Sequence, residues 1–255
     1  MAVSPSLSFI ERGSGPPLLL IHGLMVAGEM FEPVLDSLAA RHRVIVPDLR
    51  GHGASRGLPP PYTVPQHAAD LAALLNHLRI ASAAILGYSQ GGAVAQQLVL
   101  SYPTLCTRLV LACTYAFNRA TARERIEGWL VPALLTGLGM RRFARLVIGM
   151  GLRRVDARRA AWVQDMMARQ DLPLMRTAWK EAMTFDSRPR LREIACPTLI
   201  VAGELDTAVP MHHARMLRDG IAGSTLQVIA GGDHAVIWAQ PQEFVRVVSE
   251  FLGAE

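Results

Sequence analysis

The feature that most constrains how this chain of 255 residues can fold is a serine that stands between two glycines, where a predicted strand meets a predicted helix. The pentapeptide Gly-Tyr-Ser-Gln-Gly at 87–91 directly follows the apolar run 83–86 and directly precedes a helical pattern at 92–98. Such a tight turn forces its central residue into a strained backbone conformation, and the glycines leave space where neighbouring backbone approaches. We therefore expect Ser89 to expose its hydroxyl as a nucleophile. The backbone N–H of Gln90, at the start of the helix, is expected to stabilise a negative oxygen.

Two further side chains are candidates for activating this serine. A serine hydroxyl is a poor nucleophile until a base removes its proton, and the base needs a carboxylate to orient its ring. Asp206 follows the apolar run 196–203, and His234 follows the strand-like run 225–230 and a Gly-Gly-Asp turn. Both residues therefore lie just beyond the C-terminal end of a predicted strand, where open α/β sheets collect their functional groups.

The order Ser89, Asp206, His234, with a Gly-x-Ser-x-Gly turn between strand and helix, resembles the α/β-hydrolase family. The resemblance implies a serine hydrolase with a Ser-His-Asp triad. It also favours Asp206 as the acid by its position in the family's pattern. The residues alone leave Glu204 and Asp233 open as alternative acids, and either of them also fits a solvated loop.

An early loop matches the same family. The apolar run 17–21 predicts a buried parallel strand, and the tripeptide His-Gly-Leu follows it directly. By the resemblance, the backbone N–H of Leu24 is the second donor to the oxyanion, beside that of Gln90. His22 is interpreted as a structural residue that positions the loop. The turn at 48–55, which follows the next predicted strand, is interpreted as scaffold.

Alternating strand and helix patterns predict an α/β fold with a doubly wound, mostly parallel sheet. The predicted strands lie at 6–11, 17–21, 43–47, 83–87, 108–112, 197–203 and 225–230. The clearest amphipathic helices are predicted at 64–78 and 241–252. The resemblance implies the eight-stranded sheet of the family.

No convincing strand pattern occurs between residues 117 and 192, where helical patterns prevail. In the family, an insertion after the sixth strand forms a helical cap over the active site. The resemblance therefore implies a core domain made of 1–116 and 193–255, interrupted by a helical cap at 117–192 that does not fold independently.

The segment 117–192 has an unusual charge. It holds fifteen arginines and one lysine against seven acids, in a chain whose formal net charge is +5. One interpretation is recruitment of an anionic substrate or an acidic acyl-carrier protein. The other is solvated helix faces in an arginine-rich chain. No recognisable nucleic-acid-binding motif accompanies the charge, so nucleic acid is not an expected partner.

Apolar residues of this segment, and residues next to the candidate catalytic positions, are candidate walls of an acyl or aryl pocket. Packing of the cap on the core explains the tryptophans among them equally well. The candidate pocket residues are Met25, Tyr88, Trp129, Trp162, Trp179, Val209 and Ala235.

We expect neither a metal nor a nucleotide cofactor, because no His, Cys and carboxylate group has metal-ligand spacing and no phosphate-binding glycine motif follows a strand. Cys106, Cys113 and Cys196 fit reduced thiols. No apolar stretch of about 18 residues predicts a membrane span. The start at 1–5 lacks a signal-peptide pattern, so a cytoplasmic location is expected.

The sequence thus predicts a serine hydrolase that cleaves a carboxylic ester of modest size through an acyl-enzyme. Relatives with this triad leave other functions open: a C–C bond hydrolase, an enol-lactonase or a cofactor-free haloperoxidase. Gln90 and Ala235 stand where haloperoxidases often have Met and C–C hydrolases often have Trp, which weakens those two alternatives. A non-catalytic ligand receptor on a hydrolase scaffold is a further alternative, since a fold alone does not fix function.

Overall fold

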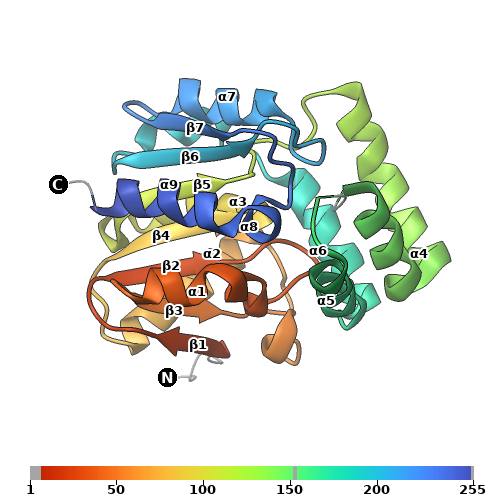
Figure 1. Cartoon of the computed structure of the whole chain (residues 1–255), viewed down its shortest axis with the longest axis horizontal. Coiled ribbons are helices and arrows are strands. Elements are labelled where there is room, and N and C mark those ends of the chain that lie inside the picture. Colours follow the sequence, from red (N-terminus) through yellow and green to blue (C-terminus); the bar gives the residue numbers. More distant parts are fainter. Residues whose placement is uncertain (1–6, 152–153, 254–255) are drawn as a thin grey trace.

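The computed structural model describes residues 7–151 and 154–253, and it places all their side chains except those of 150 and 151. The N-terminal segment 1–5 considered above lies outside the described residues. The described chain forms one sheet in the order β1-β3-β2-β4-β5-β6-β7, with helices on both faces (Figure 1). The strands are β1 (Phe9–Arg12), β2 (Pro17–Ile21), β3 (Arg43–Pro47), β4 (Ala83–Tyr88), β5 (Cys106–Ala112), β6 (Thr198–Gly203) and β7 (Thr225–Ile229).

All neighbouring strands pair in parallel except β1, which runs antiparallel to β3 at one edge of the sheet. The predicted doubly wound, mostly parallel α/β fold is therefore confirmed. The eight strands implied by the resemblance are not confirmed, because the sheet has seven strands within 7–151 and 154–253. The count of eight came from the resemblance, whereas the residues supply only seven apolar or alternating runs. Among the strands that the structure describes, the helical insertion follows the fifth, β5.

The sheet side chains alternate between two apolar cores, one on each face. In β2, Leu18 and Leu20 belong to one core, while Leu19 and Ile21 belong to the other. The first core is covered by α1 (Glu32–Ala39), α8 (Val236–Ala239) and α9 (Pro241–Gly253). The second is covered by α2 (Val64–His77), α3 (Gln90–Ser101) and α7 (Met211–Gly220). Short 3-10 turns lie at Gly28–Phe31, Gly53–Ser55, Pro103–Leu105 and Arg188–Glu193.

The segment between β5 and β6, which we call the helical insertion (117–192), stands to one side of the sheet (Figure 1). Buried side chains from its helices join the first of the two cores, so the insertion packs on the rest of the chain. None of the helices in the part of the chain that the structure describes combines the length and apolar content needed to cross a bilayer. The helices of the insertion are α4 (Ala122–Gly151), α5 (Ala157–Ala168) and α6 (Leu172–Thr184).

Two glycines allow α3 to pack tightly against the sheet. A β-carbon at Gly91 would lie 2.1 Å from the carbonyl oxygen of Ile21 in β2, and one at Gly87 would lie 2.4 Å from the Gly91 carbonyl oxygen. Both separations are far below van der Waals contact and both partners are backbone, so no side chain fits. The start of α3, and the serine before it, are thereby held against the end of β2.

We expect Gly91→Ala to lower the free energy of unfolding by about 2 kcal/mol or more, because the added methyl group must displace backbone. Gly137→Ala is the matched control, since Gly137 is exposed on α4 and a β-carbon there meets no atom within 4 Å. That control should raise stability by up to about 1 kcal/mol through helix propensity. Urea unfolding of both variants measures the difference, and equal stabilities would contradict the packing described here.

Candidate active site

Ser89 occupies the turn between β4 and α3 in a strained conformation, with φ 55° and ψ −123°. A residue with a side chain adopts this region at a cost of order 1–3 kcal/mol unless surrounding contacts impose it. The Ser89 N–H donates to the Ala112 carbonyl of β5 at 2.9 Å, and the Thr114 hydroxyl donates to the Ser89 carbonyl at 2.5 Å. The neighbouring strand and the residues just after it therefore hold the turn in place.

The structure brings the three predicted polar residues together at the carboxyl ends of β4, β6 and β7. His234 Nε2 lies 3.1 Å from Ser89 Oγ, and His234 Nδ1 lies 2.8 Å from Asp206 Oδ2. In the neutral ring, these contacts require that Nδ1–H donates to the carboxylate and that Nε2 accepts from the serine hydroxyl. This is the geometry that a nucleophile, a base and an orienting acid need.

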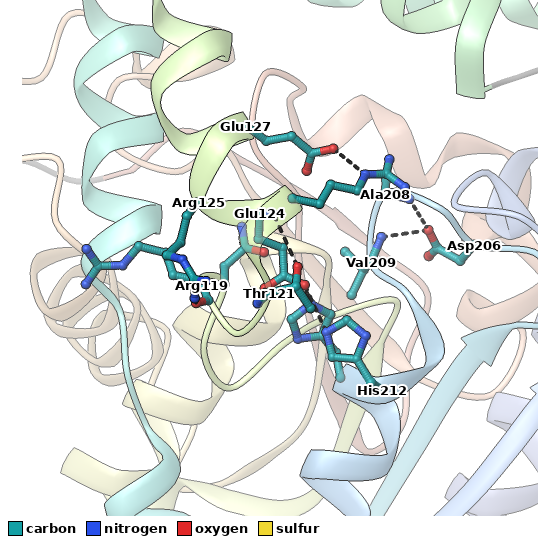
Figure 2. A network of polar contacts seen from close by, with 12 residues as sticks. Arg119, Thr121, Glu124, Arg125, Glu127, Asp206, Ala208, Val209 and His212 are labelled. Atoms are coloured by element: carbon teal, nitrogen blue, oxygen red, sulfur yellow. Dashed lines mark hydrogen bonds and ion pairs between the residues drawn. The ribbon is translucent and has the colours of Figure 1, made fainter.

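Backbone amides fix the orientation of Asp206. Its Oδ1 accepts the N–H groups of Ala208 and Val209 at 2.9 and 2.8 Å (Figure 2). This leaves Oδ2 for His234. The Asp206 side chain is almost fully buried. A buried carboxylate with two backbone donors and one imidazole partner is well satisfied in its charged form.

The two alternative acids, Glu204 and Asp233, make hydrogen bonds with other groups. Glu204 is exposed, and its Oε2 accepts the Gly231 N–H at 2.7 Å. Asp233 accepts the Ala235 N–H at 2.8 Å through its Oδ1. The structure therefore pairs the imidazole of His234 with Asp206, the acid that the resemblance had favoured.

The electrostatics of His234 follow from this pairing. Burial of the ring by itself lowers the pKa of His234, but the negative charge of Asp206 and the hydrogen bond to it outweigh burial. The pKa is consequently raised above its ordinary value of 6.5. Tyr88 anchors the same residue, because its hydroxyl donates to the His234 carbonyl at 2.7 Å. Burial raises the pKa of Tyr88 well above its usual range, so this hydroxyl stays protonated.

The loop after β2 lies directly against the serine, as a β-carbon placed on Gly23 would be 3.2 Å from Ser89 Cβ. Within the described residues, the backbone N–H groups of Leu24 and Gln90 donate to no other protein group. Both donors are thus free to bind a ligand oxygen. His22 fixes the loop, since its Nδ1–H donates to the Gly23 carbonyl at 2.7 Å and its Nε2 accepts the Leu49 N–H at 2.9 Å. Burial lowers the pKa of His22 to about 4, so its ring is neutral.

The predicted pocket residues differ in burial and fall into three groups. Trp162 and Trp179 are partly buried and pack against the first apolar core. The buried members of the set are Met25, Tyr88, Val209 and Ala235.

Trp129, the remaining candidate, differs from the others because its side chain is 86% exposed on α4. The buried side chain of α4 nearby is Glu124, five residues earlier. Five residues correspond to roughly 140° of rotation around a helix, so the face that carries Trp129 points away from the core.

Sequence reasoning missed Thr114, whose hydroxyl holds the Ser89 carbonyl. The only signal for it was its place just after the predicted strand 108–112, at the edge where Ser89 was also expected.

A cleft of about 370 Å³ elsewhere on the surface is lined by residues that include Asp48, Arg56 and Arg169 but not Ser89. Both carboxylate oxygens of Asp48 already accept backbone N–H groups, from Gly28 and Ala54. This agrees with the interpretation of the turn at 48–55 as a structural element.

The chain matches the Alpha/beta hydrolase family over residues 18–247 and therefore belongs to that family. A Rhodobacter capsulatus protein named magnesium-chelatase 30 kDa subunit is 34% identical over 245 residues, which cover 86% of this chain and 80% of that protein. An Aeromonas hydrophila subsp. hydrophila protein named pimeloyl-(acyl-carrier protein) methyl ester esterase is 30% identical, covering 97% of this chain and 100% of that protein. Among solved structures, a hydrolase from Pseudomonas aeruginosa PA01 is 30% identical with a TM-score of 0.88, covering 97% of this chain and 94% of that one.

The pKa of His234, measured from its ring signals by NMR, should lie above 6.5 and should fall when Asp206 is replaced in Asp206→Asn. Asp233→Asn is the matched control, since Asp233 contributes the last and weakest of the effects that raise the pKa. A fall in the control as large as in Asp206→Asn would show that general surface charge, and not the hydrogen-bonded pair, raises the pKa.

Proposed function

We propose that the protein is a serine hydrolase that cleaves carboxylic esters through an acyl-enzyme. The observation that carries the proposal is the continuous contact from Ser89 Oγ through His234 to Asp206, at 3.1 and 2.8 Å. The strained turn that presents the serine and the two free backbone N–H groups beside it supply the other parts of an acyl-transfer site.

In the first step, His234 Nε2 takes the proton of Ser89 as the serine oxygen attacks the ester carbonyl. The N–H groups of Leu24 and Gln90 stabilise the negative oxygen of the tetrahedral intermediate. Asp206 stabilises the imidazolium without taking its proton. The bond to the alkoxy group then breaks, and His234 protonates the leaving alcohol. In the second step, His234 deprotonates a water that attacks the acyl-enzyme, and the acid leaves with Ser89 restored.

We assign the helical insertion the role of a cap over this site. Two arginines of the insertion donate to backbone carbonyls of the core near the reactive residues. Arg123 Nη2 reaches the carbonyl of Thr207, next to Asp206, at 3.4 Å, and Arg159 Nη1 reaches the carbonyl of Trp238, four residues after His234, at 2.6 Å. These contacts tie the insertion to the loop that follows β6 and to α8.

The names of the relatives bear on the choice of reaction. The Aeromonas relative, aligned along its whole length, is named for ester hydrolysis, and its substrate is carried by a protein. The name of the Rhodobacter relative denotes a subunit and specifies no reaction of its own. The full-length likeness to an esterase and the geometry of the site together favour ester cleavage.

Ser89→Ala should lower kcat/KM for p-nitrophenyl butyrate by at least about a thousandfold, because no other group replaces the nucleophile. Ser101→Ala, at the other, exposed end of α3, is the matched control and should leave the rate unchanged. Undiminished turnover by Ser89→Ala would remove the proposed mechanism. Binding of the ester followed by a single slow turnover in the wild type would instead indicate a receptor.

We further propose that the physiological ester is presented on an acidic acyl-carrier protein. An exposed surface on α4, which we call the α4 patch, combines the apolar Ile126, Trp129 and Leu130 with Arg125. These apolar side chains are 62%, 86% and 48% exposed. Arg125 has no acidic partner within 4 Å in the described part of the chain. An apolar surface with an unpaired cation suits an acidic, amphipathic partner.

The double variant Arg125→Gln/Trp129→Ala should lower kcat/KM for a carrier-protein ester about tenfold, the effect of losing a docking hot spot. The rate with p-nitrophenyl butyrate should not change, because that ester needs no docking. Arg246→Gln on α9, where the arginine is paired with Glu243 and Glu250, is the charge control. The difference between variant and wild type should shrink as salt is raised. Equal losses on both esters would rule out the docking role.

A further inference from the structure

A second cluster of polar side chains lies apart from the serine, where the first turn of α4 meets the first turn of α7 (Figure 2). Glu124 comes from the helical insertion, and His212 and His213 come from the core. Glu124 Oε1 lies 2.9 Å from His212 Nε2 and 3.2 Å from His213 Nε2. One potential ligand atom from each of the three residues lies within 4.8 Å of the others.

These three atoms are buried and lack hydrogen bonds. Despite the short distances, no hydrogen bond of acceptable geometry satisfies Glu124 Oε1 or either Nε2 atom within the described residues. His213 Nδ1 is unsatisfied as well, and the His213 side chain is fully buried. Buried polar atoms without partners cost about 1–3 kcal/mol each, so such a cluster requires an explanation.

We propose that Glu124, His212 and His213 form a binding site for a divalent transition metal of the zinc class. Two imidazole nitrogens and one carboxylate oxygen are a common zinc ligand set with room for a water in the fourth position. Ligands around a tetrahedral zinc lie roughly 3.3 Å from one another, which is close to the 2.9 and 3.2 Å found here. About a third of the His212 side chain, 37%, is exposed and provides a path from solvent.

The carboxylate is already oriented for this role. Glu124 Oε2 accepts the Thr121 N–H at 3.0 Å, and the Glu124 N–H donates to Thr121 Oγ1 at 3.2 Å (Figure 2). This reciprocal pair is a capping box at the start of α4. It holds one carboxylate oxygen on the backbone and turns the other toward the histidines. Sequence reasoning expected no metal, because residues 88 positions apart show no ligand spacing until the fold brings them together.

The bound metal has a structural role. It joins the helical insertion to α7, which begins directly after the loop that carries Asp206 and Val209. A ligand that binds only the folded chain stabilises it by mass action. The inference is independent of the proposed ester hydrolysis, because none of the three ligands contacts Ser89 or His234.

Zinc titration of the chelator-stripped full-length protein, followed by calorimetry, tests the site. We expect one zinc per chain, and a melting temperature raised by roughly 5–10 °C at a zinc concentration about 100 times Kd. Glu124→Gln and His212→Ala should each weaken binding about 100-fold, as each removes one of three protein ligands. Both substitutions preserve packing, since glutamine keeps the volume of glutamate and His212 is partly exposed. Cobalt in place of zinc should give the visible absorption of a tetrahedral site in the wild type and lose it in both variants.

His234→Ala is the matched control, because Cys113, Asp206 and His234 are the other described group close enough to hold an ion. That variant should keep both the stoichiometry and the affinity of the wild type. The proposal is overturned if the wild type takes up no stoichiometric zinc, if Glu124→Gln and His212→Ala bind it as tightly as the wild type, or if His234→Ala alone abolishes binding.

Discussion

The close approach of backbone at Gly91 is the constraint on which the rest of the site depends. Because Gly91 has no side chain, the start of α3 can pack directly against the Ile21 carbonyl at the end of β2. A β-carbon at Gly91 would lie only 2.1 Å from that carbonyl oxygen. This contact brings three elements to one point: the strained Ser89, the amide of Gln90 and the loop that contains Gly23. The geometry proposed for acyl transfer therefore follows from backbone packing, and polar contacts refine it.

Asp206 shows how a loop can serve two purposes. Two backbone amides hold one of its oxygens, so the other is directed to His234 and raises the pKa of that ring. The same loop leads into α7, whose first turn holds the histidines of the proposed metal site. A metal at that position would restrain the loop from the side of the helical insertion. Asp206 and His212, through which the insertion would be attached, are thus only six positions apart in the chain.

Local patterns predicted the parts of this protein whose structure depends on nearby residues. Apolar runs marked the strands, a glycine pair marked the turn at Ser89, and a proline marked the start of α9. The features that the sequence did not reveal depend on contacts between distant segments. Trp129 belongs to a helix whose pattern does not reveal which neighbour it meets, and its exposed face became visible only from the packing of α4. Thr114 carries no motif, yet it holds the strained serine.

The sequence by itself determined the class of fold, the order of the three reactive residues and their positions beyond the ends of strands, because these follow from short-range periodicity and turn chemistry. Tertiary structure decided which carboxylate meets His234, how many strands the described sheet contains, and that Glu124 lies against two histidines. The physical reason is that a side chain's partner depends on how distant segments pack, and one chain's local pattern is compatible with several such partners.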